Sequence, residues 1–377
     1  MILRARVTVL RQSAIGLATA ALLIAVPADA QIDPSHRERC DDWQGNRFSP
    51  DERVESCTIV IQSEQPTGKN LAMAYVNRGL AWARKGEHDR AIADYDDAIR
   101  VDPTLGRAYN NRSISWREKD NYDRSIADAD EAIRLDPKQA PVYANRARTW
   151  RYKGDLDRAI TDYDEAIRLD PKRAGFYLSR ADAWRDKRDL DRAVADYDEA
   201  IRLNPKFDFA YLGRAVTWRL KRDLDRAIAD YDEAIRLNPK YEFAYSGRAR
   251  IWRLKGDLDR AIADYDEAIK LNPTYHFAYS GRAFTWWSKG DLDRAMADYD
   301  EAIRLDPKYA ERYRGRAHVW REKGDLDRAI ADYSEAIKLD PKDAEVYRSR
   351  AQVWSLKRDF DRAFADFNEA VRLDAGR

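Results

Sequence analysis

The sequence predicts an all-α fold, a solenoid of nine stacked helix pairs, because two residues recur at a fixed spacing. A tryptophan returns with a period of 34 residues, at positions 82, 116, 150, 184, 218, 252, 286, 320 and 354. A proline keeps the same period, at positions 103, 137, 171, 205, 239, 273, 307 and 341. Such a period indicates one supersecondary unit copied end to end. If each copy ends two residues after its proline, nine repeats fill residues 72–377.

Residues 242–275 illustrate how one repeat is built. Apolar and aromatic residues at helical spacing predict a first helix over Glu242 to Leu254. Gly256 suits the left-handed residue that ends a helix, and Asp257 suits the cap of the next helix. Four repeats carry another residue at this fifteenth position, where a left-handed backbone is costly, namely Asp120, Arg188, Arg222 and Arg358.

The second half of the repeat predicts another helix, over Asp259 to Leu271, with apolar residues on one face. Asn272 and Pro273 then end this helix. We expect them also to start the next repeat, with asparagine as the N-cap and proline as the first helical residue. Each repeat is therefore predicted to be an antiparallel helix pair.

These residues resemble the tetratricopeptide repeat family, and the resemblance covers all nine repeats. In residues 242–275 the positions that define the family are filled by Tyr245, Ala249, Trp252, Gly256, Ala261, Tyr265, Ala268 and Pro273. The resemblance implies a right-handed superhelix whose concave wall is formed by the first helix of each repeat. It also implies a scaffold that holds peptides or partner domains.

One departure from the family is systematic. Position 7, usually leucine in the family, is arginine in every repeat: Arg78, Arg112, Arg146, Arg180, Arg214, Arg248, Arg282, Arg316 and Arg350. Position 23 is aspartate in every repeat. Because an unpaired charge beside buried alanines would cost several kcal/mol, we predict an ion pair between the two helices of each repeat, such as Arg248 with Asp264. The alternative is that these arginines face an anionic ligand.

Residues 1–30 are predicted to be a signal peptide, outside the fold. Arg4, Arg6 and Arg11 precede an apolar run, and Ala28 and Ala30 place small residues at a cleavage site. The alternative is an uncleaved N-terminal anchor. Cleavage predicts a protein that is exported and remains in the periplasm or is secreted.

Residues 31–71 are predicted to form an N-terminal cap with a degenerate half-repeat, ahead of the nine repeats at 72–377. The helical part of the cap opens with a capping box over residues 49–52. Cys40 and Cys57 are the only two cysteines. An even number of cysteines in an exported chain predicts a disulfide bond, and two reduced thiols are the alternative.

The sequence carries no pattern of catalytic chemistry. The histidines lie at unrelated repeat positions, so no cluster suits a metal ion. No phosphate-binding loop, nucleophile motif or dinucleotide fingerprint is present. The formal net charge is +1, without the basic excess of a nucleic-acid-binding protein. We therefore predict a protein that is not an enzyme and has no metal, no cofactor, no nucleic-acid partner and no small-molecule substrate.

The first helices vary more than the second helices, and three patterns on them are candidate partner-binding sites. The first pattern is asparagine at position 6 of the first three repeats, at Asn77, Asn111 and Asn145. An amide donates and accepts hydrogen bonds at once and could clamp a peptide backbone. The alternative is ordinary surface asparagine.

The second pattern is aromatic. Phe209, Phe243 and Phe277 hold position 2 of repeats five to seven, and Trp287 adds a second tryptophan beside Trp286. Repeated aromatic residues on a concave wall suit the apolar anchors of a bound partner. The alternative is packing between adjacent repeats.

The third pattern is arginine at position 12, at Arg117, Arg151, Arg185, Arg219, Arg253 and Arg321. This row could attract an acidic peptide or a C-terminal carboxylate. Every member except Arg117 has an aspartate four residues later, as Arg151 has Asp155. The alternative is that such helical pairs neutralise the row.

The last repeat predicts a self-association surface. Phe360, Phe364 and Phe367 replace the usual leucine, isoleucine and tyrosine, and no polar helix follows to cover them. Two functions therefore fit the sequence. The leading hypothesis is a non-catalytic scaffold that binds a peptide or partner protein in the concave groove. The alternative is a structural rod that forms homo-oligomers through its open C-terminal face.

Overall fold

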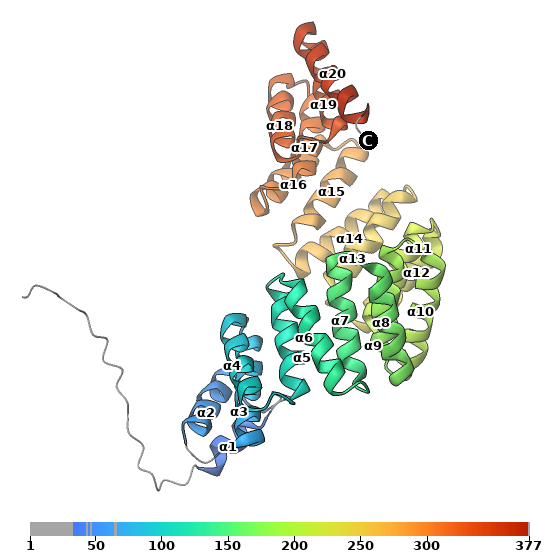
Figure 1. Cartoon of the computed structure of the whole chain (residues 1–377). Helices are drawn as coiled ribbons and strands as arrows, with labels where there is room; N and C mark the ends of the chain where they lie inside the picture. The colour runs from blue at the N-terminus through green and yellow to red at the C-terminus, as the bar shows by residue number, and fades with distance from the viewer. Residues whose placement is uncertain (1–32, 43, 46, 64–65, 376–377) are drawn as a thin grey trace, which may run out of the picture. The chain divides into compact units, whose positions relative to one another are not determined.

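The computed structural model describes residues 33–42, 44–45, 47–63 and 66–375 (Figure 1). The predicted signal peptide at residues 1–30 lies outside this part of the chain. The described residues form helices and turns without a strand, so the predicted all-α repeat solenoid is confirmed. Among them, no helix is both long enough and apolar enough to cross a membrane. The helices of the described part are α1 Pro34–Cys40, α2 Pro50–Gln62, α3 Gly68–Arg84, α4 His88–Val101, α5 Gly106–Glu118, α6 Tyr122–Leu135, α7 Ala140–Lys153, α8 Leu156–Leu169, α9 Ala174–Asp186, α10 Leu190–Leu203, α11 Asp208–Leu220, α12 Leu224–Leu237, α13 Glu242–Leu254, α14 Leu258–Leu271, α15 His276–Ser288, α16 Leu292–Leu305, α17 Ala310–Glu322, α18 Leu326–Leu339, α19 Ala344–Leu356 and α20 Phe360–Ala375.

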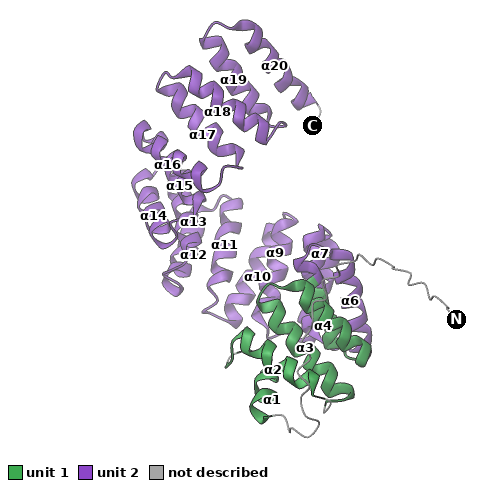
Figure 2. Cartoon of the chain, turned by 90° about the vertical axis from the view of Figure 1, so that its left-hand side faces the viewer, with its two compact units in different colours: residues 1–115 green, residues 116–377 purple. Residues whose placement is uncertain are grey.

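The chain forms two compact units, residues 1–115 and residues 116–377 (Figure 2). In the first unit, α1 and α2 pack against α3. The predicted disulfide bond joins Cys40 to Cys57, and both cysteines are buried. The capping box over residues 49–52 is also present at the start of α2. The disulfide bond thus fastens the short helix α1 to α2.

The second unit is a stack of helix pairs. The two helices of a repeat pack against each other, and the second helix packs against the first helix of the next repeat, as α14 does with α15. Neighbouring first helices also contact one another, α9 with α11, α11 with α13, α13 with α15, and α15 with α17. These first helices therefore form a continuous wall.

Most helix boundaries agree with the sequence pattern. Helix α13 spans the predicted residues Glu242–Leu254, and α14 begins one residue early, at Leu258. Gly256 has a φ of 84°. The side chain of Asp257 caps α14 by accepting a hydrogen bond from the amide of Arg260 at 3.0 Å. The four repeats without glycine adopt the left-handed turn as predicted, with φ values of 57° at Asp120, 68° at Arg188, 63° at Arg222 and 61° at Arg358.

Replacing Arg222 with glycine should raise the free energy of unfolding by about 0.5 to 1 kcal/mol. A left-handed backbone costs an L-residue about 1 to 2 kcal/mol, and the greater chain entropy of unfolded glycine cancels part of the gain. Urea denaturation followed by circular dichroism measures this difference. The reverse substitution, Gly256→Ala, should lower the same free energy by a similar amount. An Arg222→Gly variant that unfolds more easily than the wild type would contradict the argument.

The prediction that Asn272 and Pro273 start the next repeat is wrong. Asn272 is the C-cap of α14, and α15 begins only at His276. The side chain of Asn272 accepts hydrogen bonds from the amide and the hydroxyl of Thr274, at 3.1 and 2.8 Å. Asparagine and proline both favour such turns, so a short turn separates the two repeats where a helix start was expected.

Small residues let the two helices of a repeat approach closely. Ala249, Ala261 and Ala268 are all 0% exposed. Tyr265, also buried, packs with Ala249 and Ala268 against Ala278 of the next repeat. Because similar residues recur in the other repeats, the core is a chain of small clusters, each contacting its neighbours.

The predicted ion pair between the helices of a repeat is confirmed. Arg248 donates from Nε and Nη2 to Asp264 at 2.8 and 2.7 Å. Its Nη1 also donates to Asp232 of the preceding repeat at 2.5 Å, a contact that the sequence did not predict. The hydrogen bond to Asp264 raises the pKa of Arg248. The pair between positions 7 and 23 recurs at Arg78, Arg146, Arg180, Arg214, Arg282, Arg316 and Arg350.

Candidate protein-binding groove

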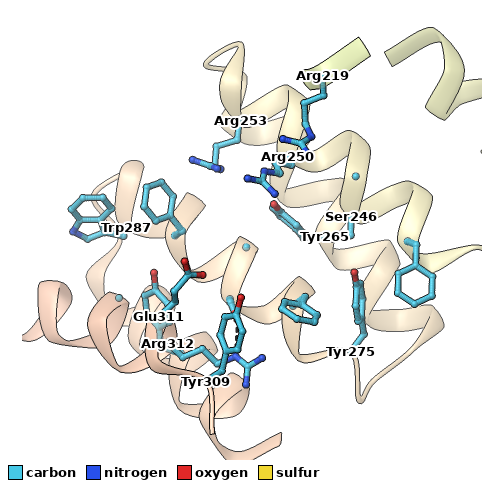
Figure 3. Close-up of a pocket in the computed structure, with 18 of the residues that line it drawn as sticks. Arg219, Ser246, Arg250, Arg253, Tyr265, Tyr275, Trp287, Tyr309, Glu311 and Arg312 are labelled. Carbon is cyan, nitrogen blue, oxygen red and sulfur yellow. Dashed lines mark hydrogen bonds between the residues drawn. The ribbon is translucent and has the colours of Figure 1, made fainter. Parts of the chain in front are cut away.

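A groove of about 990 Å³ lies along the first helices α11, α13, α15 and α17 of the second unit (Figure 3). Aromatic rings, tyrosine hydroxyls and arginines line it. The predicted partner-binding residues that line it are Arg219, Phe243, Arg253, Phe277 and Trp287. A concave, largely apolar surface with a few polar groups is typical of a binding site, so this groove is the candidate functional site.

An aromatic row runs along the groove and continues past it to Phe209. Aromatic residues at position 34 of one repeat alternate along this row with aromatic residues at position 2 of the next repeat. Neighbouring rings pack edge to face, and their centroids lie 5.0 to 6.4 Å apart. The row consists of Phe207, Phe209, Tyr241, Phe243, Tyr275, Phe277 and Tyr309. Phe209, Phe243 and Phe277 are 52, 47 and 46% exposed. The phenylalanines therefore pack between repeats and still leave about half of their surface open.

Tyrosine hydroxyls line the groove because glycine occupies position 6 of the following repeat. A Cβ atom on Gly281 would lie 2.5 Å from Cζ of Tyr265, so the ring lies directly over the glycine. The same contact recurs between Tyr231 and Gly247 and between Tyr299 and Gly315. Glycine at position 6 thus lets the tyrosines reach the groove surface.

Three arginines, which we name the arginine cluster, gather at one end of the groove. Arg219, Arg250 and Arg253 lie near the hydroxyl of Tyr265 (Figure 3). The guanidinium of Arg253 also lies over the ring of Phe284, 4.5 Å from its centroid. Within the described part of the chain, no member of the cluster forms an ion pair with a carboxylate. Burial, together with the charge of Arg250, lowers the pKa of Arg219.

Two other arginines of the position 12 row, Arg151 and Arg185, are neutralised by aspartates. Arg151 donates to Asp186 at 2.6 Å. Arg185 pairs with Asp182 at 2.9 Å, and its guanidinium also donates to the hydroxyl of Tyr197. The structure therefore divides the row into paired arginines in repeats three and four and unpaired arginines in repeats five and six.

The alternative that these arginines pair with the aspartate four residues later is wrong. Asp155 accepts a hydrogen bond from the amide of Arg158 at 3.0 Å and caps α8. Its carboxylate also pairs with the Arg158 side chain. Because the turn at Gly154 separates Arg151 from Asp155, the two residues do not lie on one helix. Aspartates cap the second helix in the same way at Asp189, Asp223, Asp257, Asp291 and Asp325.

The structure does not present the three predicted asparagines as an exposed row. Asn77 is 3% exposed, and its side-chain amide donates to Asp41 at 3.5 Å. Its backbone oxygen accepts a hydrogen bond from Arg53 of α2. Asn111 is 9% exposed, and Asn145 is half-buried in the second unit. The N-terminal helices therefore cover Asn77, which excludes it from an open binding surface.

His318 lies in the groove on α17. Its Nδ1 is 3.0 Å from the hydroxyl of Tyr333, and its ring is 6.1 Å from the ring of Trp287. Burial, reinforced by the charges of Arg321 and Arg314, lowers the pKa of His318 to about 4. The imidazole is therefore neutral at neutral pH and adds no charge to the groove.

The free energy of unfolding should fall as the pH drops from about 6.5 to about 4, in part because of His318. The unfolded histidine has a pKa of about 6.5. In this window the unfolded state binds the extra proton, so acid favours unfolding. Urea denaturation at several pH values should give a shallower slope for His318→Gln than for the wild type. Equal slopes for the two proteins would contradict the buried, neutral imidazole.

The three predicted self-association residues are exposed on α20. Phe360, Phe364 and Phe367 are 66, 67 and 53% exposed. The residues equivalent to the last two on α14, Ile262 and Tyr265, are 7 and 3% exposed because α15 packs over them. Helix α20 thus presents an apolar face that other second helices bury.

Two features of the groove were not apparent in the sequence. Arg250, the third member of the arginine cluster, occupies position 9 of its repeat. The residue at position 9 varies among the repeats, so the sequence shows no row of arginines there. The tyrosines at position 24 recur in nearly every repeat and resembled core residues. Only the glycine of the following repeat indicates that their hydroxyls face the groove. In the described part of the chain, no group of three or more His, Cys, Asp or Glu side chains is arranged to hold a metal ion.

Family models of tetratricopeptide repeats match much of the chain. A model described as tetratricopeptide repeat matches residues 145–208, 185–242, 219–276 and 255–310. A second model of this description matches residues 72–105. A model described as TPR repeat matches residues 317–354. No curated protein matches the chain.

Solved structures give the same fold. A tetratricopeptide repeat protein from Parabacteroides merdae has a TM-score of 0.55 and 20% identity, covering 66% of this chain and 98% of that chain. The APC/C hetero-tetramer Cut9-Hcn1 has a TM-score of 0.54 and 17% identity, covering 89% and 78%. A monomeric mutant of IFIT1 with Gppp-AAAA has a TM-score of 0.52 and 15% identity, covering 86% and 87%. At these identities the likeness concerns the fold alone. The repeat models and the helix-pair solenoid agree, and the chain belongs to the tetratricopeptide repeat family.

Proposed function

We propose that this protein is a non-catalytic scaffold that binds an extended segment of a partner protein in the groove along α11, α13, α15 and α17. Proteins of this repeat family generally bind proteins or peptides. The groove lies on the wall formed by the first helices, where side chains from successive repeats can contact one extended segment.

The observation that carries this proposal is the aromatic row. Phe243 and Phe277 leave about half of their surface open in the groove, and neighbouring rings hold them from both sides. A ring fixed in this way loses little conformational entropy when a partner packs against it. Such preorganised aromatic residues are typical energetic anchors of interfaces.

A display selection with random peptides tests the proposal. Peptides enriched on the purified protein are synthesised with a fluorophore, and their affinity is measured by fluorescence anisotropy. The variant Phe243→Ala/Phe277→Ala/Trp287→Ala should bind them at least about tenfold more weakly, because each buried ring contributes more than about 1 kcal/mol at a typical anchor. The matched control, Phe360→Ala/Phe364→Ala/Phe367→Ala, also removes three rings but leaves the groove intact, and should bind normally.

Two outcomes would overturn the groove proposal. One is the absence of any enriched peptide. The other is equal affinity of the enriched peptides for the wild type and the groove variant. Both variants must first show the helical circular dichroism of the wild type, so that lost binding reports on the groove and not on the fold.

We also propose that the protein is exported, to the periplasm or beyond the cell. The charged start, apolar run and small residues of residues 1–30 support export, and so does the Cys40–Cys57 disulfide bond, because disulfides persist in oxidising compartments. Cell fractionation with mass spectrometry of the N-terminus tests this. A cytosolic protein that retains residues 1–30 would contradict it.

A second candidate function, self-association through α20, is favoured by the exposed Phe360, Phe364 and Phe367. Three apolar rings on one helix face suit packing against the same face of a second copy. In sedimentation velocity at micromolar concentration, the wild type should form dimers or larger species that Phe364→Glu/Phe367→Glu abolishes. A wild type that stays monomeric at high micromolar concentration would exclude this function.

A further inference from the structure

We propose that the surface of α3 formed by Ala74, Arg78 and Lys85, which we name the α3 face, is a docking site for α20 of a second copy of this chain. Helix α2 packs on α3 in the structure and covers this site (Figure 2). The inference rests on the second candidate function only in that both use the exposed face of α20. It goes further by giving α20 a different partner surface, which is closed until α2 leaves it.

The first argument is the way in which one repeat holds the next. Each contact between repeats uses two polar positions of the second helix, seven residues apart. Position 25 accepts a hydrogen bond from the position 7 arginine of the next repeat, as Asp232 does from Arg248 at 2.5 Å. Position 18 pairs with the position 14 lysine of the next repeat, as Asp225 does with Lys255. A first helix is therefore recognised by a fixed pair of polar residues.

Helix α2 makes the same two polar contacts with α3, although it lies outside the nine repeats. Arg78, at position 7 of the first repeat, donates from Nη1 to the hydroxyl of Thr58 at 3.2 Å. Lys85, at position 14, pairs with Asp51. Asp51 and Thr58 are also seven residues apart. Helix α2 thus occupies the place of a second helix, with Asp51 as its position 18 and Thr58 as its position 25.

The apolar contacts agree with this register. In the stack, the tyrosine at position 24 packs against position 3 of the next repeat, as Tyr265 does against Ala278. Cys57 stands at the corresponding place on α2, and with Val60 it packs against Ala74, which is position 3 of the first repeat. The α3 face is therefore an ordinary contact surface between repeats, and α2 covers it in place of a preceding repeat.

Helix α20 carries the complementary residues, and they are exposed. Asp361 and Asn368 hold positions 18 and 25, and Phe367 holds position 24. Asp361 and Asn368 are exposed, and Phe367 is 53% exposed. In the register of the stack, Asp361 would meet Lys85, and the side-chain oxygen of Asn368 would accept from Arg78. The charges and the apolar ring of α20 therefore match the α3 face.

Helix α2 fits the α3 face less well than a second helix does. Two residues after Asp51, at the place of position 20, α2 carries Arg53 where the repeats carry alanine or serine. This side chain is 0% exposed, and in the described part of the chain its Nε and Nη1 have no hydrogen-bond partner. Buried charged N–H groups without an acceptor are unfavourable. Helix α20 carries Ala363 at this position and avoids the cost.

The disulfide bond between Cys40 and Cys57 offsets this poor fit. It fastens α2 to α1 within the same chain, so α2 competes for the α3 face as an intramolecular partner at high effective concentration. A contact between α20 and the α3 face joins two different surfaces, and such a contact lets a chain of copies grow. A contact between two α20 helices joins identical surfaces and stops at a dimer. Closure of the α3 face therefore limits assembly.

Sedimentation velocity of the variant Cys40→Ala/Cys57→Ala tests the docking site. Loss of the disulfide bond should release α2, and the variant should form species larger than those of the wild type, growing with protein concentration. Amide hydrogen exchange of α2 reports whether the α3 face has opened. If α2 stays protected, adding Val60→Asp places a charge against Ala74 and should release it.

Two further pairs of substitutions in the same background locate the surface. Phe364→Glu/Phe367→Glu should abolish the large species, because it places charges on the apolar face of α20. The matched control Tyr152→Glu/Leu254→Glu adds the same charge at apolar residues outside α3 and α20, which are 61 and 51% exposed. The control should assemble like its parent.

Cross-linking identifies the two surfaces in contact. Two proteins without the native cysteines are mixed under oxidising conditions, one with Ala74→Cys and the other with Phe367→Cys. Docking of α20 on the α3 face should give a disulfide-linked heterodimer, because position 24 packs against position 3 in the stack. The second candidate function predicts links between two copies of the Phe367→Cys protein instead. Mass spectrometry of the linked peptides distinguishes the two products.

The outcomes separate this inference from the second candidate function. A variant with α2 released that sediments like the wild type would overturn the docking site and leave contact between two α20 helices standing. Large species that survive Phe364→Glu/Phe367→Glu, or links only between two Phe367→Cys proteins, would also overturn it. So would an α2 that stays protected in every variant. A monomeric wild type, together with links between positions 74 and 367 in the mixture, would exclude the second candidate function and support the docking site.

Discussion

The variant Arg248→Met should have a free energy of unfolding about 3 kcal/mol lower than the wild type. Arg248 gives Asp264 two hydrogen bonds, and Asp264 is only 8% exposed. Methionine fills a similar volume but leaves the buried carboxylate without a countercharge, and breaking a buried pair from one side typically costs about 3 to 5 kcal/mol. Urea denaturation followed by circular dichroism measures the loss.

Two companion variants isolate the cause. Arg248→Met/Asp264→Leu removes both charges and should recover most of the stability, since an apolar pair of similar volume often replaces a buried ion pair at little cost. Arg236→Met makes the same substitution at an arginine that is 66% exposed and pairs with Glu233. It should cost at most about 1 kcal/mol. If Arg248→Met were no worse than Arg236→Met, the pair would not be a structural element of the fold.

The variant Cys40→Ala/Cys57→Ala should lower the stability of the N-terminal helices by about 3 kcal/mol. The disulfide bond closes a loop of 17 residues, and the loss of this constraint enlarges the unfolded ensemble by about that free energy. Helix α1 has only seven residues and cannot persist alone. Amide hydrogen exchange should show α1 and α2 losing protection, while α13 to α16 keep theirs.

Reduction of the wild type offers an independent check on this result. Dithiothreitol should reproduce the exchange pattern of the double alanine variant, because both treatments remove the same bond. Unchanged protection of α1 and α2 after either treatment would mean that packing against α3, and not the disulfide bond, holds the cap.

The fold followed from the sequence because its determinants are local and repeated. Helix bounds, left-handed turns and the pair of Arg248 with Asp264 all depend on residues within one repeat or at its edge. The one error in the repeat, at Asn272 and Pro273, has a local cause as well. Both residues are used at helix starts and in turns, and only the hydrogen bonds from Thr274 decide between the two uses.

The candidate site was harder to predict from the sequence, because contacts between repeats decide which of its arginines are paired with a carboxylate. Arg151 and Arg253 occupy the same repeat position, yet Arg151 pairs with Asp186, 35 residues later, and Arg253 lies over the ring of Phe284. No helical spacing rule reports such a partner. The aromatic residues were easier to identify, because Phe243 and Phe277 repeat at one position and stay half exposed.

The two partners of Arg248 lie 16 residues before it and 16 residues after it. A repeat therefore attaches to its predecessor through the same side chain that closes its own helix pair. If any repeat from the second to the seventh were duplicated or deleted, an identical arginine would meet an identical aspartate across the new boundary, whereas Ser334 takes the place of this aspartate in the eighth repeat. The number of repeats can thus change during evolution without any compensating substitution in the ion pairs. The residues of the first helices, which define the groove, remain free to diverge independently.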